Sequence, residues 1–98
     1  MQPLGGFASD IVRGIIRRAP LSPEKVAFAW RSAAGPAMAR VASVDLSSDG
    51  IVEVRCPDDH WRKEIRRSSS MLRDRLRVLL GDEVVRQVKV KARSREQN

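Results

Sequence analysis

The stretch 42–56, ASVDLSSDGIVEVRC, decides the fold of this 98-residue chain. In its first half, up to Leu46, apolar residues alternate with polar ones, which is the pattern of a strand with one buried face. The second half, from Ile51 onward, alternates in the same way, and the residues between the halves end in Asp49-Gly50, a pair typical of tight turns. The stretch therefore predicts a β-hairpin that turns at residues 47–50.

Two helices are predicted before the hairpin. Residues 4–19 have apolar side chains at steps of three to four, the stripe of an amphipathic helix, and Pro20 ends it. Ser22-Pro23 begins the next helix, because a serine hydroxyl caps free N–H groups and proline suits the first helical position. Gly35-Pro36 ends that helix, and a short helical turn through Arg40 follows. The first stripe comprises Phe7, Ile11, Ile15, Ile16 and Ala19, and the buried face of the second helix comprises Val26, Trp30, Ala33 and Ala34.

A further helix and a third strand are predicted after the hairpin. Pro57-Asp58 ends the second strand and caps a helix that runs to Gly81. Serines at positions 68–70 are weak helix formers in its middle, so they predict either a kink or a break into two helices. From Val84 to Ala92 valines alternate with basic residues, which indicates a strand. The apolar face of the long or split helix comprises Trp61, Ile65, Ser68, Leu72, Leu76 and Leu79.

This order of elements predicts an α+β domain of two layers. A helical crossover between two strands is right-handed, so the third strand should lie parallel to one hairpin strand in a mixed three-stranded sheet. Helices cover one face of the sheet, and the other face is polar. We expect one domain over residues 1–93 and a disordered polar tail over 94–98. The residues expected on the polar face are Glu53, Arg55, Lys89 and Lys91.

The charge balance points to an anionic partner. The chain has 19 Lys and Arg against 12 Asp and Glu, a net charge of +7, and its pI is near 11.0. A single cysteine, Cys56, excludes an internal disulfide, and a single histidine, His60, leaves too few ligands for a closed zinc site. No apolar stretch is long enough to span a membrane, and no signal peptide is visible. We therefore expect a cytoplasmic, nucleoid-associated protein without a metal or a membrane partner.

Basic residues are concentrated after the hairpin. On the long helix four arginines recur at spacings of four, seven and four, so they form a stripe beside the apolar face. Unpaired like charges repel one another, so attraction to phosphates explains the stripe better than stability does, although a solvated helix face is the alternative. The candidate nucleic-acid-binding residues are Arg62, Lys63, Arg66, Arg67, Arg73 and Arg77 on the helix, and Lys89, Lys91 and Arg93 on the closing strand.

The remaining notable residues have structural interpretations. Trp30 and Trp61 lie on apolar helix faces, so we interpret them as core anchors and not as stacking platforms for bases. Gly35 and Gly50 are counted with them as structural residues at a helix end and a turn. The sequence shows no nucleophile constellation, carboxylate pair or phosphate-binding glycine loop. We therefore expect neither catalytic residues nor a cofactor, and no enzymatic activity.

If the long helix is split, the chain ends in strand, helix, helix, strand, which resembles the type II KH arrangement. KH domains clamp a nucleic-acid backbone with a G-x-x-G loop between those helices, whereas this chain has serines at 68–70. Over about residues 22–92 the chain resembles the DciA-like family, bacterial proteins associated with the replicative helicase, whose core is KH-like without the glycine loop. The resemblance rests on Trp30 before Gly35-Pro36, the hairpin strand at 49–54, Trp61 with Ile65, Leu72 and Leu76, and Gly81 before the valine-rich strand.

The resemblance implies a non-enzymatic adaptor that binds DNA, single-stranded or double-stranded, and the replicative helicase, and that assists helicase loading. Two other interpretations stay open. The KH-like order and the basic stripe also suit an RNA-binding module in translation or RNA metabolism. A third interpretation is a basic face that docks onto an acidic protein surface.

Overall fold

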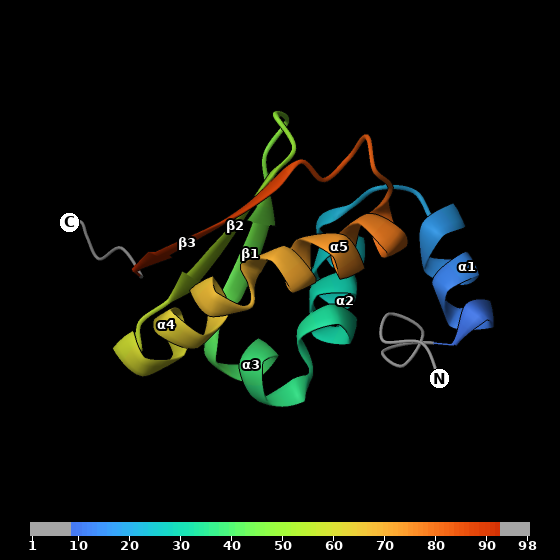
Figure 1. The fold of residues 1–98 in the computed structure, drawn as a ribbon. Helices are drawn as coiled ribbons and strands as arrows, with labels where there is room; N and C mark the ends of the chain where they lie inside the picture. Colours follow the sequence, from blue (N-terminus) through green and yellow to red (C-terminus); the bar gives the residue numbers. More distant parts are fainter. Residues whose placement is uncertain (1–8, 93–98) are drawn as a thin grey trace.

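The computed structural model describes residues 9–92 of the chain (Figure 1). Helices and strands follow one another in the predicted order, with the long helix split in two. The elements are α1 (Asp10–Arg18), α2 (Pro23–Ala34), α3 (Pro36–Val41), β1 (Ser43–Leu46), β2 (Ile51–Cys56), α4 (Asp59–Arg67), α5 (Ser69–Leu80) and β3 (Gln87–Ala92).

The three strands form one mixed sheet in the order β1-β2-β3. β1 pairs antiparallel with β2, and the register places Val44 beside Val54. β2 pairs parallel with β3, with Glu53 beside Lys89. The predicted hairpin and the predicted parallel closing strand are both confirmed.

Helices lie together on one side of the sheet, so the domain has two layers (Figure 1). α2 packs against β1, whereas α4 and α5 pack against β3. The predicted α+β architecture is confirmed and is consistent with a KH-like fold. Apolar side chains between the layers form the core: Ile16, Val26, Ala29, Trp30, Ala33, Ala42, Val52, Val54, Cys56, Ile65, Leu72, Leu76, Leu79, Leu80 and Val85.

The sequence predicted either a kink or a break at the serines of positions 68–70, and the structure shows a break into two helices. α4 ends at Arg67, and the backbone of Ser68 leaves the helical region with ψ of 7°. Its amide still donates 3.1 Å hydrogen bonds to the carbonyls of Glu64 and Ile65. Its own carbonyl accepts from the Leu72 amide at 2.9 Å, so the last turn of α4 leads directly into the first turn of α5.

The first helix differs from its predicted form. Within the described residues it starts at Asp10, with Ser9 as N-cap, and the predicted residues 4–8, Phe7 among them, lie outside the described range. Of the described part of the apolar stripe only Ile16 is buried, whereas Ile11 is 75% exposed and Ile15 is exposed as well. Periodicity predicted an amphipathic helix, but of the described stripe residues the packing of α1 against α5 buries Ile16 alone.

The third strand begins three residues later than predicted, at Gln87 instead of Val84. The Val84 amide donates a 3.1 Å hydrogen bond to the Gly81 carbonyl, so this residue belongs to the turn that follows α5. The ladder starts when the amides of Arg86 and Gln87 reach the Gly50 carbonyl, at 2.7 and 3.3 Å. The hairpin turn therefore also sets the beginning of β3.

Gly50 occupies a position that only glycine suits. Its φ is +85°, in the left-handed region that costs other residues strain. A Cβ built there lies 2.8 Å from Cγ of Arg86 and 3.1 Å from the carbonyl oxygen of Val84. Glycine therefore allows the hairpin turn to approach the start of β3 closely.

Candidate nucleic-acid interface

The break at Ser68 distributes the predicted arginine stripe over two helices. Arg62 and Arg66 lie one turn apart on α4, and Arg73 and Arg77 lie one turn apart on α5. The stripe is therefore divided into two pairs on consecutive helices. Each pair must be judged by what its own side chains contact.

Arg62 has a structural role. Its Nη1 donates to the carbonyls of Cys56 at 2.8 Å and Pro57 at 3.0 Å, and its Nη2 contacts Asp59 at 2.8 Å. The side chain is only 17% exposed. Arg62 therefore satisfies the backbone acceptors where β2 turns into α4, and little of its charge is free for an external ligand.

Three further arginines have loose ion pairs at the surface. Arg67 lies 3.6 Å from Glu64, Arg73 lies 3.4 Å from Asp74, and Arg77 lies 3.7 Å from Asp82. Exposed pairs of this kind contribute little to stability, so a phosphate competes with them at small cost.

Lys63, Arg66 and Arg67, here called the α4 basic cluster, lie in the last two turns of α4. All three side chains are exposed, and among the residues that the structure describes Lys63 and Arg66 have no hydrogen bond or ion pair. The cluster adjoins the start of α5, where Ser68 gives no side-chain cap to the helical N–H groups. Unpaired basic side chains beside a helix N-terminus create a positive region.

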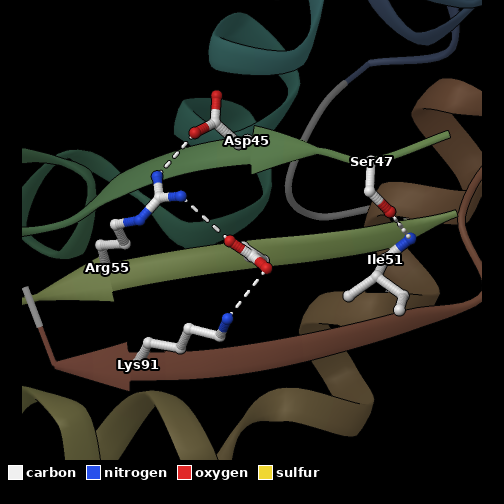
Figure 2. A network of polar contacts seen from close by, with 6 residues as sticks. Asp45, Ser47, Ile51, Arg55 and Lys91 are labelled. Atoms are coloured by element: carbon white, nitrogen blue, oxygen red, sulfur yellow. Dashed lines mark hydrogen bonds and ion pairs between the residues drawn. The ribbon is translucent and has the colours of Figure 1, made fainter. Parts of the chain in front are cut away.

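The open face of the sheet has a different electrostatic character, because acidic residues lie among the basic ones. Arg55 donates to Asp45 at 2.6 Å and to Glu53 at 3.0 Å, and Lys91 donates to Glu53 at 3.0 Å (Figure 2). The hydrogen bond with Asp45 is the main reason that the pKa of the Arg55 guanidinium is raised. This network joins all three strands and neutralises most of its own charge.

The candidate residues of β3 therefore differ from one another. Lys91 is paired with Glu53, whereas Lys89 is exposed and lies next to Glu53 in the register without an ion pair among residues 9–92. Arg93 lies outside the described residues.

Two arginines near α3 were not among the predicted candidates. Arg31 on α2 and Arg40 on α3 line a surface cavity of about 250 Å³ together with Pro36 and Ala39. Both arginines are exposed, and α3 packs against α4. The sequence signal was weak, because the two residues lie on separate helices around Gly35-Pro36 and show no periodic spacing.

The residues predicted to be structural occupy distinct positions. Trp30 is 2% exposed and lies in the core, whereas Trp61 is partly buried at the core margin, where its ring meets the edge of His60. Gly35 and Gly50 both have positive φ. In the described range no group of three or more His, Cys, Asp or Glu residues is placed to hold a metal ion. None of the helices found there is long and apolar enough to cross a membrane.

The fold and the surface define a class: a small α+β domain with a mixed three-stranded sheet, two consecutive helices joined at Ser68, and exposed basic side chains on the first of them. The sequence model of one family, described as "Dna[CI] antecedent, DciA", matches residues 3–90. The chain belongs to the DciA family, which is associated with helicase loading in bacterial replication and linked to the replicative helicase. No curated protein and no solved structure matches the chain significantly.

Proposed function

We propose that this chain is a non-enzymatic adaptor that binds DNA, associates with the replicative helicase and assists its loading at the nucleoid. Membership of the DciA family supports the helicase association. The observation that supports DNA binding is the α4 basic cluster, in which Lys63 and Arg66 have no partner among the described residues. The folded unit that we propose is one KH-like domain over residues 1–93.

Binding in this proposal is directed at the backbone of DNA. The α4 basic cluster and the weakly paired Arg73 and Arg77 contact phosphates, and Lys89 adds a charge from the edge strand. Contacts to phosphates position a strand but do not distinguish bases. Trp30 is buried, so it offers no ring for base stacking. We therefore expect little sequence preference.

A loading assay tests the proposal. The purified chain is mixed with the replicative helicase of the same bacterium and a forked DNA, and ATP-dependent unwinding is measured with and without the chain. We expect association with the helicase, faster unwinding and no ATP hydrolysis by the chain alone. A double variant, Lys63→Glu with Arg66→Glu, should lose the stimulation.

Arg18→Glu with Arg86→Glu is the matched control, because it makes the same change in net charge at two exposed arginines that the proposal does not use. It should stimulate like the parent chain. Neither association nor stimulation by the parent chain would contradict the proposal. Preferential binding of RNA over DNA of the same sequence would favour the RNA-binding alternative instead.

A further inference from the structure

A groove runs along the outer edge of β1. It has a volume of about 260 Å³ and is lined on one side by Leu21, Ser22, Pro23 and Val26, and on the other by Val44, Asp45 and Leu46. Val44, Asp45 and Leu46 are consecutive, and successive strand residues point to opposite faces of a sheet. A groove that contacts all three residues therefore lies at the edge of the strand and not on one face of the sheet. The groove therefore lies between the start of α2 and the free edge of β1.

The backbone of β1 presents unpaired groups at this edge. β1 is the outermost strand and pairs only with β2. The Ser47 amide donates a 2.9 Å hydrogen bond to the carbonyl of Ile51, its partner across the hairpin. In an antiparallel ladder, residue pairs that exchange backbone hydrogen bonds alternate with pairs that do not. The backbone groups of Asp45 and Ser43 therefore also point toward β2. The N–H and C=O groups of Val44 and Leu46 therefore point away from the sheet. Within residues 9–92 they have no hydrogen bond to another element.

The side chains along this edge determine which kind of ligand can bind there. Val44 and Leu46 are half-buried and pack against the core, so the groove beside them is apolar, and its outer wall is Leu21, which is 55% exposed. Asp45 points to the open face of the sheet, where Arg55 contacts its Oδ2 (Figure 2). Its other carboxylate oxygen has no hydrogen bond within the described range.

We propose that the β1 edge binds an extended peptide of another protein by strand addition, and that the peptide has an apolar, basic, apolar alternation. The backbone groups of Val44 and Leu46 pair with the added strand. Its apolar residues, which lie opposite these two, enter the groove beneath Leu21. Its basic residue lies beside Asp45 on the open face. This site is separate from the α4 basic cluster and does not depend on DNA binding.

Charge distinguishes this occupant from a second copy of the chain. Two β1 edges that pair antiparallel through Val44 and Leu46 of both copies place Asp45 directly opposite Asp45. Like charges in that position destabilise strand pairing. A basic residue at the same position is favourable, so the edge suits a foreign peptide better than it suits itself.

The test uses synthetic fluorescein-labelled octapeptides with a central Val-Arg-Val or Val-Glu-Val, titrated against the full chain labelled with ¹⁵N. We expect the Val-Arg-Val peptide to bind, with the largest amide shifts at Val44 and Leu46. The Val-Glu-Val peptide should bind about tenfold more weakly, and Asp45→Asn should reduce that difference.

Two variants of the chain test the site by separate routes. Leu21→Lys closes the groove at an exposed position, so it should fold and weaken the Val-Arg-Val peptide about tenfold. Val44→Pro removes the outward N–H without loss of a bond to β2 and should abolish binding. Phe28→Ser is the control, because Phe28 is an exposed apolar residue that does not line the groove.

Three results would overturn the proposal. The first is no binding of either peptide at millimolar concentration by the folded chain. The second is binding that Leu21→Lys leaves unchanged. The third is a concentration-dependent dimer that Val44→Pro dissociates, which would assign the edge to a second copy. None of these results bears on the helicase assay, so failure here and failure of the adaptor function are distinguishable.

Discussion

Lys91 reaches diagonally across the parallel pair of β2 and β3 to Glu53, with Nζ 3.0 Å from Oε2, although the register partner of Glu53 is Lys89. The second carboxylate oxygen of Glu53 contacts Arg55, also at 3.0 Å. One acidic side chain thus holds two of the basic groups on the open sheet face. Its presence reduces the attraction of this face for phosphates.

Removal of the Glu53 charge should therefore tighten DNA binding. We expect Glu53→Gln to raise the affinity for single-stranded DNA about two- to threefold at low salt, because Lys91 loses its carboxylate partner while Arg55 keeps only Asp45. Lys91→Ala should have little effect in the parent chain but should cancel the gain in the Glu53→Gln background. Fluorescence anisotropy on the four chains measures this cycle. Unchanged affinity in Glu53→Gln would place the sheet face outside the interface.

Gly50→Ala should destabilise the fold more than Gly35→Ala. Both glycines have positive φ, near +85° and +90°, so both substitutions have backbone strain of about 1 to 3 kcal/mol. At Gly50 the added Cβ also meets Arg86 and the Val84 carbonyl, whereas at Gly35 nothing lies within 4 Å. We expect a loss of about 2 to 3 kcal/mol at Gly50. Urea unfolding of the two variants checks the order, and equal losses would show that the close approach is not limiting.

The two tryptophans should differ in their contribution to stability. Trp30→Ala removes a side chain that is 2% exposed and should cost about 3 to 5 kcal/mol in the free energy of unfolding. Trp61 is only partly buried, so Trp61→Ala should cost about half as much. Thermal and chemical unfolding measure both. A larger loss at Trp61 would contradict the assignment of Trp30 as the main aromatic core residue.

Arg62→Ala should reduce the stability of the fold and Arg66→Ala should not, although the two residues lie one turn apart on α4. Arg62→Ala leaves the carbonyls of Cys56 and Pro57 without their donor, so we expect a loss of about 1 to 2 kcal/mol. Arg66→Ala removes an exposed side chain and should change the stability by less than about 0.5 kcal/mol. Comparison of denaturation midpoints tests this contrast. A destabilised Arg66→Ala would reveal a structural role that its exposure does not indicate.

Local patterns predicted the sheet well because short-range rules determine its parts. Asp49-Gly50 defines the hairpin turn, and the alternation around Val52 and Val54 identifies the buried face. Ser22 and Asp58 cap the helices that their positions predict, with side chains that accept from the amides of Lys25 and Trp61.

The parts that sequence reasoning missed depend on which elements meet in space. The exposure of Ile11 and Ile15 follows from the single edge by which α1 packs against α5, and no periodicity predicts that. The pairing of Lys91 with Glu53 needs the register of β3, and the contact of Arg62 with the Cys56 carbonyl needs the angle of α4. The candidate basic residues were recognisable as a group, but their individual availability was not.

Charge reversal on α4 and α5 provides the most direct test of the proposed DNA interface. Arg66 has no partner among the described residues, and Arg73 has only a 3.4 Å pair with Asp74, so both are available to phosphates. With about four to six phosphates neutralised, the logarithm of affinity for single strands should fall against the logarithm of salt concentration with a slope of about −3 to −4.

The double variant Arg66→Glu with Arg73→Glu should bind more weakly on every sequence and show a flatter slope. Because Arg66 is exposed and the Arg73 side chain is 40% exposed, its unfolding should stay close to that of the parent chain. A control with Arg18→Glu and Arg86→Glu has the same net charge without these positions, so equal effects in the two variants would mean that total charge, and not this corner of the fold, holds the DNA.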